Sequence, residues 1–577
     1  MPRLIMITAF IITQFLCSTV WAATYYIDFN NGSDSNSGLS QLAAWKTLPG
    51  TRTTNDLGWQ STSWGGGTID SYHKVAAGTV FELKRGTTHD SSNGGKIYIE
   101  STFYDSGAIN LSNPVTIEVD TSWGSGNVVF DGSGINLNAG NDPGGWGLIH
   151  IEDMGGIIFD GRFYNGIVIR DSVNRGISVY SKSLQPGSEF KFIKFFNNGT
   201  GIPSDMQGAS EGQLAIQYVT GGGINQCEFD GNNNYINGIT LGESHYYVQG
   251  FTITNTEIYN HRGDVSGNDS GIGIKAYNSQ VTINKVTSHN NLKGLDLGEQ
   301  HGSTDINYKV LNSYIYSNYW GLNFSASSTT YPGTIKWYVI NNIIIDNAQL
   351  GSNIYASPFD LYLVHNVYAN NGSASTDGDY ANINLSQNYA DTWTINAYLY
   401  NNIFFKPAGG SNFVITRYDK DTIGMNVYSD YNSWVQKGSE YFMQWDYFGI
   451  SSPHSFPYGA TQGPGHDDSY WYTYYDYNTV APKNGSLGHY HADSHSVGTG
   501  AEDTTLPPFT DIANHDYSLT SDYPGLDLTT QSWYIPEMGK DRNGDCRVTW
   551  DLGAFESNGQ ECGLNPSPPF NINVAIN

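Results

Sequence analysis

The sequence predicts an all-β fold in which the chain winds through successive stacked coils, a parallel β-helix (β-solenoid). Two patterns support this prediction. Short β-branched segments recur between residues 225 and 402, with starting points 24 to 30 residues apart and Asn or Asp at the ends of most of them. A second short segment with alternating apolar residues follows most of them. A fixed period of this length is typical of solenoids, and period-2 alternation without a helical stripe makes the repeating unit a strand.

The first recurring segment occupies residues 225–230, 255–260, 285–290, 313–318, 342–347 and 366–371. Asn at a turn tolerates left-handed backbone geometry, and its amide can bond to an Asn of the next coil. We therefore expect columns of Asn side chains along the solenoid. An antiparallel sandwich also has many short strands, but it does not predict one residue type at one repeated spacing.

The second recurring segment occupies residues 238–241, 271–274, 294–297, 321–324 and 382–385. Gly opens four of the five and can supply a corner without a Cβ clash. The apolar residues of each segment should point inward, so the residues between them should point outward. Those residues are Thr240, Gly273, Asp296, Asn323 and Asn384. This alignment makes Lys275 a diagonal neighbour of Asp296.

The chain divides into four parts. Residues 1–22 match a secretory signal, with a charged start, a short apolar run and a Val20-Trp-Ala22 cleavage pattern, so we expect an exported, soluble protein without a membrane anchor. Residues 23–135 should form the N-terminal cap and first coils, and residues 136–435 the regular solenoid. Residues 436–577 should hold a Tyr-rich insert, either functional or covering the last strand edge, and a closing coil packed on the same domain.

Charge and composition restrict the partners. The net charge of -27 argues against nucleic acid, and 41 Tyr and 14 Trp suit stacking on sugar rings. We expect a monomer that acts on a polysaccharide. Cys546 and Cys562 could form a disulfide across a short loop, whereas Cys227 occupies a strand position and should be a buried small side chain.

Motifs at both ends of the chain carry a resemblance. They are Tyr25 to Leu48, Gly78 to Gly86, Ser429 to Trp434, Ala492 to Ser496, Asp516 to Leu519 and Asp551 to Glu556. Together they resemble secreted bacterial proteins of the pectate-lyase-like right-handed parallel β-helix superfamily, over nearly the whole mature chain. The resemblance implies a single-stranded right-handed β-helix in an extracellular or periplasmic protein. It leaves the activity open, because the superfamily holds lyases, hydrolases, epimerases and binding proteins.

One part of the solenoid carries a narrower resemblance. Residues 267–275 and 289–296 resemble the calcium-binding coils of one pectate lyase family. The resemblance places Asp269 and Asp296 at two carboxylate ligands of Ca²⁺. The other two ligand positions hold Leu292 and Lys293, and the position of the family's catalytic lysine holds Asn323. Lys293 could fill the space of the cation as a fixed positive charge.

Ionisable residues gather on the same coils. Gly242-Glu-Ser-His245 recurs as Gly298-Glu-Gln-His301, although only 14% of the chain is charged. Solvated corner residues without a role would give the same pattern. The candidate catalytic residues are Lys275, Asp296, Glu299, His301, His245, Lys293 and Arg262. The candidate substrate-binding residues are Asn323, Trp320 and Arg417. The candidate ligands of a Ca²⁺ ion are Asp269, Asp296, Glu243 and Glu299.

Three functions fit these residues. A polysaccharide lyase would use Lys275 as the base in β-elimination on a uronic-acid glycan, with a cation neutralising the substrate carboxylate. A glycoside hydrolase would use a carboxylate pair, Asp296 with Glu299 or Glu243. A glycan-binding protein would use the same face without catalysis. We favour the lyase, then the hydrolase.

A last motif lies near the C-terminus. Asp541 to Asp545 matches the start of a calcium-binding EF-hand loop. Cys546 stands where that loop needs Gly, and Leu552 where it needs an acidic residue. We therefore expect a polar turn before a closing strand that ends at Glu556.

Overall fold

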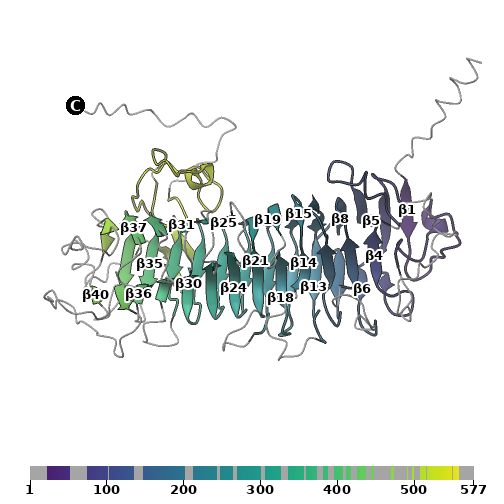
Figure 1. The fold of residues 1–577 in the computed structure, drawn as a ribbon, viewed down its shortest axis with the longest axis horizontal. Coiled ribbons are helices and arrows are strands. Elements are labelled where there is room, and N and C mark those ends of the chain that lie inside the picture. The colour runs from purple at the N-terminus through teal and green to yellow at the C-terminus, as the bar shows by residue number, and fades with distance from the viewer. Residues whose placement is uncertain are drawn as a thin grey trace, which may run out of the picture.

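The computed structural model shows an elongated all-β molecule (Figure 1). It describes residues 23–51, 75–101, 103–135, 147–201, 212–242, 247–263, 270–299, 306–326, 335–355, 359–372, 381–386, 395–406, 411–417, 425–436, 443–447, 470–472, 490–491, 497–498, 507, 509–514, 516–548 and 550–557. Within these residues the helices are short 3-10 turns, η1 (Gln41–Ala43), η2 (Ile512–Asn514) and η3 (Pro536–Gly539). None of the described helices is long and apolar enough to cross a membrane.

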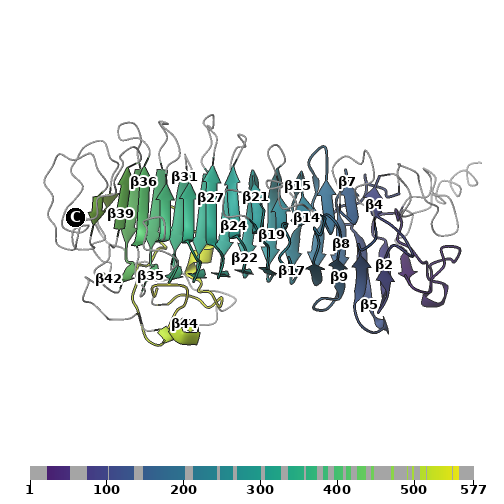
Figure 2. The ribbon, with the colours of Figure 1, turned by 90° about the horizontal axis from the view of Figure 1, so that it is seen from below.

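Three long sheets run along the molecule (Figure 2). Sheet 1 holds β1 (Thr24–Ile27), β2 (Val80–Arg85), β5 (Val115–Gly124), β8 (Ile157–Asp160), β11 (Gln185–Pro186), β12 (Glu189–Lys191), β15 (Val219–Thr220), β16 (Gly223–Asn225), β19 (Val248–Thr254), β22 (Ser279–Asn284), β25 (Asn307–Leu311), β28 (Ile335–Ile340), β31 (Phe359–Val364), β34 (Ile395–Tyr400), β37 (Met425–Asp430) and β41 (Tyr490–His491). Sheet 2 holds β4 (Ile97–Glu100), β7 (Ile149–Glu152), β10 (Ile177–Tyr180), β14 (Gly212–Ile216), β18 (Asn237–Leu241), β21 (Ile272–Tyr277), β24 (Lys293–Glu299), β27 (Trp320–Ala326), β30 (Leu350–Tyr355), β33 (Ala381–Ser386), β36 (Ser411–Arg417), β39 (Met443–Tyr447) and β40 (Tyr470–Tyr472). Sheet 3 holds β3 (Thr88–His89), β6 (Val128–Asp131), β9 (Ile167–Arg170), β13 (Ile193–Phe196), β17 (Glu228–Asp230), β20 (Glu257–Tyr259), β23 (Thr287–His289), β26 (Tyr314–Tyr316), β29 (Ile343–Ile345), β32 (Val367–Ala369), β35 (Ile403–Lys406), β38 (Ser433–Gln436) and β42 (Val497–Gly498).

The chain visits the sheets in turn, for example through β18, β19, β20 and β21 in sheets 2, 1, 3 and 2. Neighbouring strands in these sheets pair in parallel, apart from the antiparallel pair β39 and β40. Each coil adds a layer to one apolar interior, such as the fully buried column Ile239, Ile274, Leu295 and Leu322. The predicted fold class, an all-β parallel β-helix, is confirmed. The three-sheet pattern starts within residues 23–135, where the first coils are expected.

The predicted asparagine columns are present at two corners of the coils. Between sheets 3 and 2, the Asn318 amide donates to Asn347 Oδ1 at 3.1 Å, and the Asn347 amide donates to Asn371 Oδ1 at 2.8 Å. Between sheets 1 and 3, the Asn366 amide donates to Asn402 Oδ1 at 3.0 Å. The columns consist of Asn291, Asn318, Asn347, Asn371 and Asn382, and of Asn342, Asn366, Asn402 and Asn432. These buried amides also bond to backbone groups and so help fix the register.

The register of sheet 2 differs from the sequence alignment by two residues at β21. Ile274 pairs with Leu295, and Lys275 pairs directly with Asp296. The predicted diagonal arrangement of these two charged residues is therefore wrong. A Cβ on Gly273 would lie 2.5 Å from the carbonyl oxygen of Gly294, so Gly273 is the glycine that the close approach of coils requires. Gly271, with φ of +78°, belongs to the preceding turn.

The N-terminal motif that carried the resemblance forms a cap around Trp45. The ring of Trp45 stacks on Tyr25 at 4.4 Å, and its Nε1 donates to the Asn36 carbonyl at 2.9 Å. Asp34 Oδ1 accepts the backbone N–H groups of Lys46 and Thr47 at 2.8 and 2.9 Å. This loop folds over β1, the first strand of sheet 1, and covers its edge.

Residues 509–514, 516–548 and 550–557 form a strap along the outside of the coils, drawn in yellow in Figures 1 and 2. Its strands β43 (Phe509–Asp511) and β44 (Asp516–Leu519) pair only with each other. Leu528 and Met538 pack against the outer side of sheet 1, and Leu552 and Ala554 pack against the outer side of sheet 3. The expected closing coil is therefore a strap instead, and residues 553–556 form no strand.

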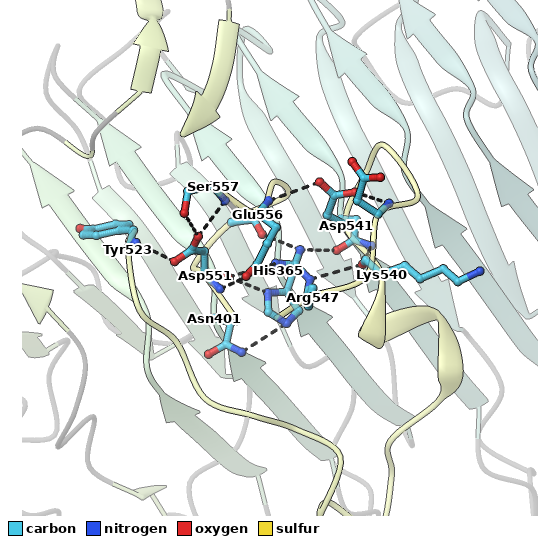
Figure 3. Close-up of polar contacts among 12 residues, drawn as sticks. His365, Asn401, Tyr523, Lys540, Asp541, Arg547, Asp551, Glu556 and Ser557 are labelled. Carbon is cyan, nitrogen blue, oxygen red and sulfur yellow. Dashed lines mark hydrogen bonds and ion pairs between the residues drawn. The ribbon is translucent and has the colours of Figure 1, made fainter. Parts of the chain in front are cut away.

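A buried polar network anchors the strap (Figure 3). The side chains of Arg547 and Glu556 are both fully buried and form an ion pair at 3.3 Å. Asp541 Oδ1 accepts the backbone N–H groups of Gly544 and Asp545 at 3.0 and 2.9 Å, which makes this segment the polar turn that its sequence predicts. Cys546 is disulfide-bonded, and the predicted partner Cys562 lies outside the described residues. Cys227 is free and buried, as predicted.

The asparagine columns give a stability prediction. Asn347→Ala removes the acceptor of the Asn318 N–H groups and the donor to the Ile315 carbonyl. Leaving buried groups unpaired should lower the free energy of unfolding by about 1–3 kcal/mol. Urea denaturation measures this loss. Asn396→Ala is the control, because that half-buried amide bonds to Asp360 on the outside of sheet 1. Equal losses in the two variants would contradict a special role of the column.

A carboxyl pair on β2 and β5 gives a pH prediction. Glu82 pairs in register with Glu118, and burial together with the charge of Glu118 raises the pKa of Glu82 to about 7 from 4.5. Folding therefore favours the protonated form of Glu82, so its contribution to stability is fully present below the unfolded pKa of 4.5 and is lost as the pH rises through about 7. In the Glu82→Gln variant, the melting temperature should depend less on pH over this range. If the melting temperatures of the variant and the parent changed with pH in the same way, Glu82 would not have the raised pKa.

Candidate functional site

The candidate site lies on the outer face of sheet 2. Strand alternation places one outward residue of each coil in a single row, because the flanking Ile274, Ala276, Leu295 and Leu297 are buried in the interior. The row, in register from β18 to β33, consists of Thr240, Lys275, Asp296, Asn323, Asn353 and Asn384. Two charged residues and three amides thus follow one another along the solenoid.

Asp296 is the centre of this row. Its carboxylate accepts from Lys293 Nζ at 2.8 Å, from Asn323 Nδ2 at 2.7 Å and from the Tyr277 hydroxyl at 3.2 Å. The residue is entirely buried. Burial by itself disfavours the charged carboxylate, but the charge and hydrogen bond of Lys293, the Asn323 amide and the charge of Lys275 hold the pKa of Asp296 below its ordinary value. Asp296 is therefore ionised and fixed in position.

Two lysines act on this one carboxylate, Lys293 through a hydrogen bond and its charge and Lys275 through its charge. Lys293 Nζ lies 5.2 Å from the ring centroid of Trp320, and Lys275 Nζ lies 5.1 Å from that of Tyr277. Contacts of this kind stabilise a cation by roughly 0.5–2 kcal/mol. The side chain of Lys293 is 12% exposed, whereas Lys275 is nearly covered. Of the two ammonium groups, Lys293 is thus the more open to a ligand.

An aromatic and amide surface continues from the lysines towards the C-terminal coils. Trp320 Nε1 donates to Gln349 Oε1 at 2.5 Å, and the Trp320 ring packs against Leu350 and Ala381. Beside it, the Asn353 amide donates to Asn323 Oδ1 at 2.8 Å, and the Asn384 amide donates to Asn353 Oδ1 at 3.0 Å. An aromatic ring next to a row of amides suits a sugar chain, which offers both apolar ring faces and hydroxyl groups.

The structure brings five of the predicted site residues together: Lys275, Lys293, Asp296, Trp320 and Asn323. Two others are placed elsewhere on these coils. Glu299 is buried at the end of β24, and Arg262 is exposed in the turn before β21, where its guanidinium packs over Tyr235 at 5.2 Å. Arg417 ends β36, and its side chain is outside the described part of the chain. The predicted residues Glu243, His245, Asp269 and His301 also lie outside it.

Sequence reasoning missed Tyr277, Gln349 and Asn353. Tyr277 lies two residues after Lys275 and so faces outward with it, which period-2 alternation could have indicated. Asn353 lies in the outward row, but the strand Leu350–Tyr355 escaped notice because Ser352 takes the place of an inward apolar residue. Gln349 precedes that strand, and no sequence signal pointed to it.

The described residues include no group of three or more His, Cys, Asp or Glu side chains that could hold a metal ion. Of the four candidate calcium ligands, Asp296 and Glu299 fall within these residues. Asp296 already accepts from an ammonium group, an amide and a hydroxyl. The structure thus places the ammonium group of Lys293 against Asp296.

No protein-family model matches the chain, and no curated protein matches it. Among solved structures the chain is similar to XylC in complex with xylose, with 10% identity, 72% of this chain and 83% of that chain covered, and a TM-score of 0.39. It is also similar to pectate lyase Pel9A, with 14% identity, 94% and 98% covered, and a TM-score of 0.36. A rhamnogalacturonan lyase gives 14% identity, 68% and 84% covered, and a TM-score of 0.31. At these identities and TM-scores the likenesses do not bear on activity or substrate.

The ion pair gives a double-mutant prediction. Asp296→Leu leaves Lys293 and the Asn323 amide without their acceptor, and it should lower the free energy of unfolding by about 3–5 kcal/mol. Lys293→Met in the same chain removes the unpaired ammonium group, so the double variant should be more stable than Asp296→Leu alone. Chemical denaturation of the parent, both single variants and the double variant measures the coupling. Strict additivity would contradict the ion pair.

Proposed function

We propose that this protein is a secreted carbohydrate-active enzyme, a polysaccharide lyase that cleaves a uronic-acid-containing glycan by β-elimination on the outer face of sheet 2. The observation that carries the proposal is the convergence of Lys275 and Lys293 on the buried carboxylate of Asp296, beside Trp320. The side chain of Lys293 is partly exposed, whereas the carboxylate of Asp296 is buried, so this face presents a positive charge. An anionic sugar can bind there although the whole chain carries -27.

The chemistry divides among the residues of this face. Lys293 neutralises the carboxylate of the uronate, which acidifies the proton on the adjacent carbon. Lys275 is the candidate general base that removes that proton. The electron pair forms a carbon–carbon double bond, the glycosidic carbon–oxygen bond breaks, and the leaving oxygen takes a proton, for which the Tyr277 hydroxyl is the candidate donor. The amide row Asn323, Asn353 and Asn384 binds neighbouring sugar hydroxyls.

The environment of Asp296 disfavours it as the general acid of the hydrolase alternative, which would then need Glu299 or Glu243 in that role. A glycosidase needs one carboxyl group whose pKa is raised, so that it can protonate the leaving oxygen. Despite its burial, Asp296 has a lowered pKa, because Lys293, Asn323 and Lys275 stabilise the carboxylate. Its oxygens are also engaged by three donors. The third alternative, a glycan-binding protein, would bind the sugar on the same face but would not cleave it.

The sequence of residues 1–22, which resembles a secretory signal, supports the proposal that the protein is exported. A substrate outside the cytoplasm, such as a cell-wall or matrix polysaccharide, agrees with this pattern. We therefore propose that the mature protein acts in the periplasm or outside the cell, as a monomer on a polysaccharide.

A substrate panel tests the proposal. Incubation with pectate, alginate, hyaluronate and neutral glycans should give ultraviolet absorbance of an unsaturated uronate on one of the acidic polymers. Lys275→Ala should lower kcat by about 10²–10⁴-fold, since it removes the base. Lys191→Ala is the matched control, because that lysine pairs with Glu189 on sheet 1. Reducing ends without absorbance would indicate a hydrolase, and binding without turnover would indicate a glycan-binding protein.

A further inference from the structure

The position of Lys293 bears on how this face could bind an anion. Lys293 is the first residue of β24, three residues before Asp296, and its ammonium group reaches back to Asp296 Oδ2 at 2.8 Å. The Trp320 ring on the next strand lies under the same ammonium group at 5.2 Å. A fully buried acceptor on one side and an aromatic ring on the other hold the positive charge at one place. An ammonium group has three donors, and the hydrogen bond to Asp296 engages one of them.

A calcium ion does not fit at Asp296 in this arrangement. Ca²⁺ takes six to eight oxygen ligands, with carboxylates foremost among them. Asp296 Oδ2 accepts from Lys293 and Tyr277, and Oδ1 accepts from Asn323. A Ca²⁺ ion bound to Oδ2 would also lie beside the ammonium group of Lys293. Two neighbouring cations repel strongly at a buried position, where water screens their charges only weakly.

We infer that Lys293 takes the place of a metal ion at Asp296: its ammonium group, held by Asp296 and Trp320, binds the carboxylate of an acidic sugar, and no divalent cation binds to Asp296. The sugar-binding part of the inference rests on the proposed function. The metal-independent part rests on the contacts of Asp296 alone. Because Lys293 is partly exposed and Asp296 is not, an incoming carboxylate meets the cation and not the anion of the pair.

The metal part is tested by a charge exchange. Lys293→Asp places a second carboxylate beside Asp296 and removes the competing cation. Ca²⁺ should raise the melting temperature of this variant, and Tb³⁺ luminescence should report a bound ion that the parent lacks. Lys309→Asp is the matched control, because Lys309 also pairs with a carboxylate, that of Glu537, but on the outside of sheet 1. If Lys293→Asp binds Ca²⁺ or Tb³⁺ and Lys309→Asp does not, the inference that Lys293 takes the place of a metal ion is supported.

Two results would overturn the metal part. One is a Ca²⁺ ion bound by the parent and lost in Asp296→Asn, because Asp296 would then be a calcium ligand despite Lys293. The other is a folded Lys293→Asp that binds no more Ca²⁺ or Tb³⁺ than Lys309→Asp. Circular dichroism establishes whether the variant is folded. If it is not, the comparison of the parent with Asp296→Asn decides, and unchanged ion binding in that pair supports the inference.

The sugar part is tested by calorimetry with oligogalacturonate and oligomannuronate. Lys293→Met keeps the length of the side chain and removes the charge, so it should weaken binding of the acidic oligosaccharide at least tenfold, and added Ca²⁺ should not restore the affinity. Unchanged affinity would overturn the role of Lys293. If the parent binds neither oligosaccharide and also yields no unsaturated product from any acidic polymer of the substrate panel, the sugar part is overturned together with the proposed function, and the metal test still stands.

Discussion

The stacking of one coil directly on the next is the constraint on which the rest of this structure depends. Parallel strands in register lie about 4.8 Å apart, so every position of a coil becomes a column along the molecule. An inward column must be apolar throughout, as in Ile239, Ile274, Leu295 and Leu322. A corner column can be asparagine throughout, because each amide both donates to the next one and accepts from the previous one. The outward row of sheet 2 obeys the same rule and collects residues from six coils on one line.

The same constraint explains how a chain with so few charged residues builds a charged site. Lys275 and Asp296 are 21 positions apart in the sequence but directly opposite each other in the sheet. A buried ion pair contributes little to stability, since desolvation opposes the attraction. Here the carboxylate has three donors, and the pKa of Asp296 is lowered despite its burial. What the arrangement provides is a fixed position for a positive charge, which is useful for binding an anion.

The outer columns of sheet 3 show that the strap belongs to the fold. In the N-terminal coils one such column holds Lys194 and Glu228, an ion pair at 2.7 Å. In the C-terminal coils the same column continues as Ile343, Val367 and Ile403, which pack against the strap. The column is apolar where the strap covers sheet 3 and charged in the N-terminal coils. The strap thus buries sides of the solenoid away from the outer face of sheet 2 and leaves that face to its polar row.

The sequence by itself determined the solenoid, the strands of sheets 2 and 3 in its central part, the asparagine columns and the coils that carry the candidate site. These features follow from period-2 alternation and from a repeated residue type, which are visible along the chain. Only the tertiary structure decided the register at β21, because it depends on where the backbone of Gly273 can approach the carbonyl of Gly294 in the next coil. The tertiary structure also decided which three donors surround Asp296 and where the strap packs. These contacts join residues that are distant in the sequence, and no local pattern specifies which distant side chain fills a given space.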